Sequence, residues 1–142
     1  MRYYKKSLGQ NFLIDKNIIK KIINLTNLKS QNVIEIGSGK GALTEEILKK
    51  KPKSLILLEK DNNLSKNLHS KYSLNKLVKI FNIDVLNFNF NNLKKKKIIL
   101  FGNLPYNISS QILVKLLRTK NIHLKFDHII LMFQHTRVEM EQ

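Results

Sequence analysis

Residues 33–51 read VIEIGSGKGALTEEILKKK, and this stretch decides the fold. It opens with Val33 to Ile36, which favour a strand because β-branched side chains suit a pleated sheet. The cluster Gly37-Ser38-Gly39-Lys40-Gly41 follows, and glycine permits a sharp turn. Residues 42–51 then predict a helix that ends before Pro52, since proline interrupts a helix. The stretch is therefore predicted as a strand, a tight turn and a helix.

Strands and helices alternate on either side of this unit. Isoleucines recur at helical spacing over residues 18–23, after Asp15, which suits a helix cap. Further strands are predicted at 55–58, 78–83 and 98–101, and helices at 62–71 and 109–120, the last with Ser109 as its cap. Residues 128–133 fit either a fifth strand or a short buried helix. This alternation predicts an α/β fold with a parallel sheet and right-handed crossovers.

The composition indicates one folded, basic domain. The chain has 142 residues, a hydrophobic share of 42% and a formal charge of +16 from 26 Lys+Arg and 10 Asp+Glu. That hydrophobic share excludes disorder, and the length fits one domain. The charge favours a polyanionic partner, foremost nucleic acid, although the preference for Lys over Arg also fits a bias in composition. Residues 94–97 are four lysines that fit either a solvated loop or an RNA contact.

Other classes of protein are excluded. No cysteine is present, which rules out disulfides and thiolate metal sites and fits a reducing cytoplasm. The basic N-terminus is not followed by an uninterrupted apolar stretch, and no run approaches the roughly 20 apolar residues of a membrane helix. The four histidines lack motif spacing. We therefore expect a cytoplasmic protein that is neither secreted nor membrane-spanning and that holds no metal.

Three strand ends carry a pattern typical of nucleotide-cofactor sites. Gly37-x-Gly39-x-x-Ala42 satisfies the dinucleotide fingerprint, and Glu59 lies 22 residues beyond Gly37, where an acid accepts hydrogen bonds from ribose hydroxyls. Asp84, after the third strand, suits either an exocyclic amine of the cofactor's purine or a plain capping role. A phosphate-binding P-loop is disfavoured because the Gly-Lys-Ser/Thr ending is missing. The pattern predicts a nucleoside-containing cofactor, with an ordinary strand-to-helix turn as the alternative.

The end of the fourth strand is the most informative. Asn103-Leu104-Pro105-Tyr106 places an amide, a carbonyl held by the residue before proline, and an aromatic ring within one turn. A nucleobase amine is a poor nucleophile, so acceptors that hold its hydrogens favour its methylation, and Tyr106 offers a face on which an extruded base stacks. A sulfonium methyl donor needs alignment more than a base or a metal. The glycine pattern alone also fits a nicotinamide oxidoreductase, but no hydride-transfer site is evident.

Four motifs follow one another along the chain: SLGQNFL at 7–13, EIGSGKGALT at 35–44, EKD at 59–61 and FGNLPYNIS at 101–109. In this order they resemble the ribosomal RNA adenine N6-dimethyltransferases. The resemblance extends from about Lys5 to Gln134 and is closest to the KsgA type, whose members dimethylate two adjacent adenines near the 3′ end of small-subunit rRNA. It implies a Rossmann-like class I S-adenosylmethionine-dependent methyltransferase fold with a mostly parallel sheet.

The resemblance also assigns roles to individual residues. S-adenosylmethionine would be bound by Asn11, Leu13, Gly37, Gly39, Glu59, Asp84 and Asn103, with Glu59 on the ribose and Asp84 on the adenine. The catalytic turn would consist of Asn103, Leu104, Pro105 and Tyr106. Asn11 and Leu13 come from the resemblance alone, since by pattern they belong to a polar loop before a helix. The implied partner is small-subunit rRNA in an immature small ribosomal subunit.

The chain also departs from the family. Family members run well beyond 142 residues, with further strands that complete the sheet and a small helical domain, and residues 135–142 lack the apolar pattern of the next element. We therefore expect residues 1–142 to form one incomplete catalytic domain without those parts, with residues 1–15 as an arm that contacts cofactor and RNA. The expected activity is rRNA adenine-N6 dimethylation. A catalytically impaired RNA-binding or ribosome-assembly remnant and a large-subunit rRNA adenine methyltransferase are the alternatives.

Overall fold

The computed structural model describes residues 15–133 and confirms that strands alternate with helices. The strands are β1 (Asn32–Ile36), β2 (Ser54–Leu58), β3 (Val78–Phe81), β4 (Ile98–Leu104) and β5 (Phe126–Phe133). The helices are α1 (Lys16–Ile23), α2 (Ala42–Lys49), α3 (Asn62–Tyr72), α4 (Ser109–Leu117) and α5 (Ile122–Lys125), with 3₁₀ turns η2 (Val85–Asn87) and η3 (Phe90–Asn92). None of the helices between residues 15 and 133 is long and apolar enough to cross a membrane.

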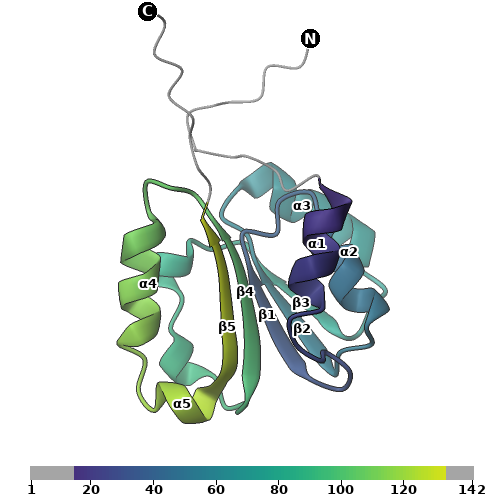
Figure 1. Cartoon of the computed structure of the whole chain (residues 1–142). Coiled ribbons are helices and arrows are strands. Elements are labelled where there is room, and N and C mark those ends of the chain that lie inside the picture. The colour runs from purple at the N-terminus through teal and green to yellow at the C-terminus, as the bar shows by residue number, and fades with distance from the viewer. Residues whose placement is uncertain (1–14, 134–142) are drawn as a thin grey trace, which may run out of the picture.

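The strands form one sheet in the order β3-β2-β1-β4-β5, and all neighbouring pairs are parallel, as predicted. Helices α1, α2 and α3 lie on one face of the sheet, and α4 and α5 lie on the other, so the domain has three layers (Figure 1). The strand order reverses between β1 and β4. In sheets of this kind, ligands bind beyond the carboxyl ends of the strands at that switch point.

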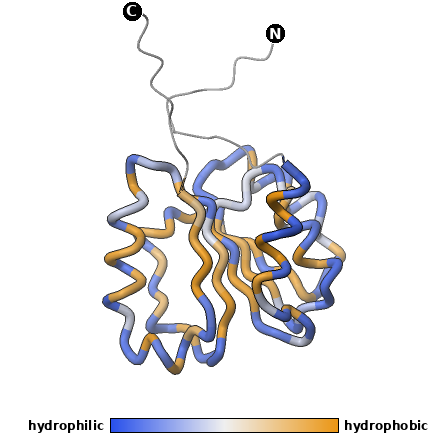
Figure 2. The backbone as a smooth tube through the Cα atoms, in the orientation of Figure 1, coloured by the Kyte–Doolittle hydropathy of each residue, from blue (hydrophilic) through white to orange (hydrophobic). Residues whose placement is uncertain are grey.

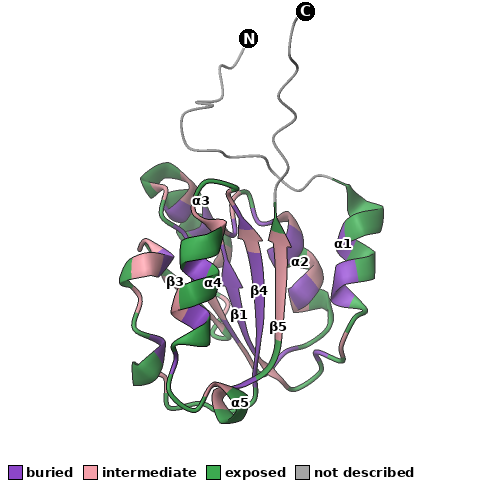
Figure 3. Cartoon of the chain, turned by 60° about the vertical axis from the view of Figure 1, so that its left-hand side comes forward, coloured by how far each residue is buried: buried purple, intermediate pink, exposed green. Residues whose placement is uncertain are grey.

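Two apolar layers hold the helices to the sheet. Because successive residues of a strand point to opposite faces, Val33 of β1 packs with α1 and α2 while Ile34 packs with α4. The central strands are mostly apolar (Figure 2) and buried, whereas β5 is only half-buried (Figure 3). Burying one such side chain contributes roughly 1.5–3 kcal/mol, so β1, β2 and β4 form the core of the domain.

One of the two predicted helix caps is confirmed. Asp15 Oδ1 accepts hydrogen bonds from the backbone N–H groups of Asn17 (2.9 Å) and Ile18 (3.4 Å) at the start of α1. The prediction for Ser109 is wrong. Ser109 is the first helical residue of α4, and its hydroxyl donates back to the Tyr106 carbonyl (3.0 Å) instead of accepting from the helix. Helix α4 therefore begins without a side-chain cap.

Strand lengths differ from the predictions because pairing partners, and not local sequence, decide where a strand ends. β3 stops at Phe81, since its partner β2 ends at Leu58, directly opposite. β4 continues to Leu104 because β5 pairs with it as far as Phe133. The extended residues 128–133 are a strand and not a helix, while α5, η2 and η3 were not predicted.

Candidate active site

The predicted site residues that the structure describes gather at the carboxyl edge of the sheet. Ile36, the last residue of β1, lies opposite Leu58 of β2 and Gly102 of β4. The residues that follow these three positions are the glycine turn, Glu59 and Asn103. Strand register therefore brings them into one row across the switch point. Asn11 and Leu13 lie outside the described residues.

The glycine turn follows β1 with a backbone that suits glycine. Gly37, Gly39 and Gly41 have φ values of +73°, +56° and +87°, a left-handed region that side chains with a Cβ rarely adopt. Gly37 also touches the end of β4, because a Cβ on it would lie 2.7 Å from the carbonyl oxygen of Asn103. The turn then closes through a hydrogen bond from Gly41 N to Ser38 O (2.9 Å). Glycine at position 37 thus permits backbone contact between two predicted site residues.

Glu59 ties the glycine turn to the end of β2. One carboxylate oxygen accepts from Gly39 N (2.9 Å) and the other from Asp61 N (3.1 Å). The side chain is buried, and this burial raises the pKa of Glu59, while the two backbone hydrogen bonds oppose the rise. Each oxygen keeps a further lone pair, so the carboxylate retains the capacity to accept from a ligand hydroxyl.

Asp84 has the capping role that was one of its two predicted roles. Its Oδ1 accepts from Leu86 N (3.0 Å) at the start of η2. Its Oδ2 forms an ion pair with Lys60 Nζ (3.3 Å), which follows Glu59 at the end of β2. The two acids after β2 and β3 are therefore neighbours at the edge, and Asp84 keeps part of its carboxylate exposed.

The prediction that Asn103-Leu104-Pro105-Tyr106 lies within one turn is wrong, because the motif straddles the end of β4. Asn103 and Leu104 are strand residues paired with Met132 and Phe133 of β5, and the turn begins at Pro105. The Leu104 side chain is fully buried, whereas the Tyr106 side chain is 64% exposed. The strand fixes the backbone of Asn103 and Leu104, and the turn presents the aromatic ring to solvent.

The structure shows one more polar side chain beside the candidate site that sequence reasoning did not single out. Glu35, in β1, is buried and accepts a hydrogen bond from the hydroxyl of Thr44 in α2, so a side-chain contact bridges the glycine turn. Burial raises the pKa of the Glu35 carboxyl to about 8, against the lowering effect of the Thr44 hydrogen bond. The nearby Ser38 hydroxyl is buried and has no hydrogen-bond partner of normal geometry in the described part of the chain. The sequence signal that could have identified Glu35 is an acid inside an otherwise apolar strand.

Neither a pocket elsewhere in the fold nor a metal site is supported as the functional site. A hollow of about 340 Å³ lies between η3 and α4 and is lined by Phe90, Lys115 and Arg118 among others, but by none of the predicted site residues. Within residues 15–133, no three His, Asp or Glu side chains are grouped in a way that suits a metal ion. The row at the carboxyl edge is therefore the candidate site.

A parallel sheet of this order, with a glycine turn after β1 and an acid after β2, is the arrangement of Rossmann-like folds that bind nucleoside-containing cofactors, among them the class I S-adenosylmethionine-dependent methyltransferases. The family model described as ribosomal RNA adenine dimethylase matches residues 1–140. The chain belongs to this family.

Relatives and solved structures agree with that membership. The chain is 46% identical to the ribosomal RNA small subunit methyltransferase A of Pelagibacter ubique over 130 residues, and 44% identical to that of Mycoplasmopsis synoviae over 131. Each match covers 92% of this chain but 49% and 48% of the relative, so the chain spans about half the length of these curated relatives.

Crystal structures of an rRNA methyltransferase and of a dimethyladenosine transferase are among those that match the fold. The 23S rRNA methyltransferase ErmE superposes with a TM-score of 0.67 at 29% identity, covering 78% of this chain and 44% of that chain. A dimethyladenosine transferase from Plasmodium falciparum superposes with a TM-score of 0.68 at 26% identity, covering 87% and 43%. The predicted fold class is confirmed.

Proposed function

We propose that this chain carries the catalytic site of an S-adenosylmethionine-dependent methyltransferase that dimethylates N6 of two adjacent adenines near the 3′ end of small-subunit rRNA. The observation that carries the proposal is the row of Gly37, Glu59, Asp84 and Asn103 across the switch point, joined by the Gly37–Asn103 and Gly39–Glu59 contacts. The natural substrate would be an immature small ribosomal subunit, in the cytoplasm.

The residues present fit the cofactor. Gly37 and Gly39 hold the turn in a left-handed backbone with Gly37 against the end of β4, the Glu59 carboxylate retains lone pairs for ribose hydroxyls, and Asp84 is partly exposed for an adenine amine. The Ser38 hydroxyl in the same turn is buried, interacts with the Glu35 carboxyl and forms no hydrogen bond of normal geometry among residues 15–133. When bound, the cofactor supplies a methyl group activated on a sulfonium.

The remaining chemistry belongs to the end of β4. The Asn103 side-chain oxygen and the Leu104 carbonyl accept hydrogens of the target amine, which favours a pyramidal nitrogen with its lone pair toward the methyl group. The exposed ring of Tyr106 stacks on the extruded base, a contact typically worth about 1–3 kcal/mol. Because β5 pairs with β4 through Asn103 and Leu104, the backbone that carries these acceptors is held in place before substrate binds.

One experiment distinguishes the proposed function from two alternative functions. ErmE, named for 23S rRNA, shares the fold at 29% identity, which makes a large-subunit adenine the second candidate substrate. The half-length match to the curated relatives makes a non-catalytic RNA-binding factor the third.

The test incubates the chain with immature small subunits, or with large-subunit rRNA, and a radiolabelled methyl donor, and then maps the modified adenines. Label in adjacent small-subunit adenines supports the proposal. Label in large-subunit rRNA selects the second candidate. RNA binding without cofactor binding in calorimetry, and without label, selects the third.

A further inference from the structure

Acidic and basic side chains are unevenly distributed between the two ends of the sheet. The acids Glu35, Glu59, Asp61 and Asp84 lie at the carboxyl edge, in or next to the candidate site. The connections that enter the five strands at the opposite edge are residues 29–31, 50–53, 73–77, 93–97 and 118–125. Together they contain twelve basic residues and no acid. We call this surface the amino-edge belt.

Hydrogen bonds hold the connections of the amino-edge belt side by side. They run from Ser30 N to Lys51 O (3.0 Å), from Lys53 N to Gln31 O (2.8 Å), from Lys95 Nζ to Ser54 Oγ (2.9 Å) and from Lys97 N to Leu124 O (3.2 Å). Lysines that are distant in sequence are therefore neighbours on one fixed surface. The run at 94–97 is not an isolated charged loop but the middle of this surface.

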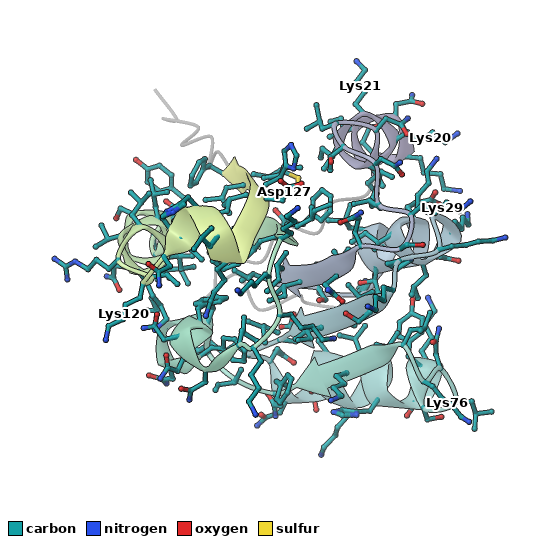
Figure 4. All side chains as sticks on the ribbon, turned by 90° about the horizontal axis from the view of Figure 1, so that it is seen from below. Lys20, Lys21, Lys29, Lys76, Lys120 and Asp127 are labelled. Atoms are coloured by element: carbon teal, nitrogen blue, oxygen red, sulfur yellow. The ribbon has the colours of Figure 1, made fainter. Side chains whose placement is uncertain are left out.

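The lysines of the amino-edge belt other than the half-buried Lys125 are exposed, and no acid in the described part of the chain neutralises a belt lysine. Lys29, Lys76 and Lys120 lie around its rim when the domain is seen from below (Figure 4). No ion pair joins a belt lysine or Arg118 to an acid within residues 15–133. The nearby Asp127 pairs instead with His128 (3.2 Å). Such a concentration of one charge attracts a polyanion and repels another copy of itself.

Two belt lysines occupy backbone positions that suit glycine. Lys51 and Lys97 have φ values of +55° and +53°, and the other described non-glycine residues with positive φ, Ser30 and Asn121, also lie in the amino-edge belt. A left-handed backbone costs a side chain with a Cβ about 1–2 kcal/mol. The positions therefore carry a cation where glycine would relieve strain, and glycine substitutions there remove charge without harming the fold.

We infer that the amino-edge belt binds the phosphate backbone of structured RNA, on the face opposite the candidate active site. The inference takes RNA as the polyanion from the proposed function. A ribosomal particle exposes rRNA on several sides of a bound protein. A face of the protein that takes no part in the chemistry therefore also contacts backbone phosphates. Each lysine that neutralises a phosphate releases counterions, which makes such binding steeply dependent on salt.

The test compares two triple variants with the same net charge. The belt variant carries Lys51→Gly, Lys96→Gln and Lys97→Gly. The control carries Lys16→Gln, Lys66→Gln and Lys79→Gln, three exposed lysines elsewhere on the domain. Anisotropy titrations of a labelled RNA hairpin over a series of KCl concentrations give the affinity and its salt slope, circular dichroism verifies folding, and calorimetry verifies cofactor binding.

We expect the belt variant to bind RNA about tenfold or more weakly and to lose about 2–3 from the slope of log K against log[KCl], about one per lysine, while the control stays within about twofold. Bound RNA should also protect Lys51, Lys96 and Lys97 of the unmodified chain from acetylation, read by mass spectrometry.

Equal loss in both variants, or no protection of these lysines, overturns the inference. So does binding to anionic lipid vesicles in place of RNA. Cofactor binding and methyl transfer are measured separately. If both are absent, the proposed function is refuted and this inference still stands. If methyl transfer is intact and the belt variant binds RNA as the unmodified chain does, this inference is refuted and the proposed function stands.

Discussion

Gly37 and Asn103 meet backbone to backbone: a Cβ on Gly37 would lie 2.7 Å from the Asn103 carbonyl oxygen, and Gly37 has a φ of +73°. The contact joins the ends of β1 and β4 at the switch point of the sheet. It places the glycine turn directly against the strand end that presents the predicted acceptors. The close approach of the glycine turn to the end of β4 therefore depends on the absence of a side chain at position 37.

Gly37→Ala is expected to destabilise the fold and abolish cofactor binding, since the new Cβ meets rigid backbone. Gly41→Ala is the matched control, because Gly41 also has a positive φ but its added Cβ would meet the movable Leu68 side chain at 3.3 Å. The left-handed backbone alone costs each variant about 1–2 kcal/mol. Urea unfolding and calorimetric titration measure both effects. Equal losses of cofactor affinity in the two variants would show that the contact does not shape the site.

Glu35→Gln is expected to remove a pH dependence of stability. Burial raises the folded-state pKa of Glu35 from 4.5 to about 8, so its contribution to stability is fully present below pH 4.5 and is lost as the pH rises to about 8. The free energy of unfolding should fall by up to about 1.4 kcal/mol per pH unit in that window. Urea unfolding between pH 5 and pH 9 should show a shallower slope in the variant than in Glu45→Gln, an exposed control. Parallel slopes in the two variants would refute the prediction.

The fold was predictable because its signals are local and repeated. The run Val33 to Ile36, the glycine cluster and the isoleucines after Asp15 each identify an element, and the alternation identifies a parallel sheet. Strand ends were not predictable, because β3 stops and β4 continues according to their partners. The error at Ser109 has a similar origin, since the preceding turn determines the direction of its hydroxyl.

The candidate site was predictable where it depends on strand register. Residues directly after parallel strands must meet at one edge, so Gly37, Glu59 and Asn103 could be grouped from sequence alone. The Glu35–Thr44 contact was not predictable, because it depends on how α2 packs over β1. The amino-edge belt was also missed, since only the folded chain brings the lysines at 50–53 next to those at 94–97.

Tyr72 and Ser38 carry buried hydroxyls whose substitution should have different effects. Tyr72 Oη lacks a hydrogen-bond partner in the described part of the chain, and burial raises the pKa of Tyr72 to about 12, whereas Ser38 Oγ, in the glycine turn, lies by the Glu35 carboxyl. Tyr72→Phe should leave the free energy of unfolding unchanged or raise it by up to about 1 kcal/mol, without effect on cofactor affinity. Ser38→Ala should weaken cofactor binding with little change in stability. Calorimetry and urea unfolding distinguish them, and an unchanged cofactor affinity in Ser38→Ala would remove Ser38 from the site.

Asn103→Ala is expected to lower the rate of methyl transfer by about 100-fold or more, as losses of single positioned hydrogen-bonding groups do in other active sites. RNA affinity should stay nearly intact, because the side chain is not a cation. Asn107→Ala, in the exposed turn after Tyr106, is the control and should keep its activity. Single-turnover rates and anisotropy titrations measure the two quantities, and equal rates in both variants would refute the role of Asn103.

The most direct measurement is methyl transfer by this chain itself. The chain is incubated with immature small ribosomal subunits and labelled S-adenosylmethionine, and the rRNA is digested and analysed by mass spectrometry. Our account predicts labelled N6,N6-dimethyladenosine at two adjacent positions near the 3′ end. Calorimetric binding of the cofactor with no label in any adenine would contradict it.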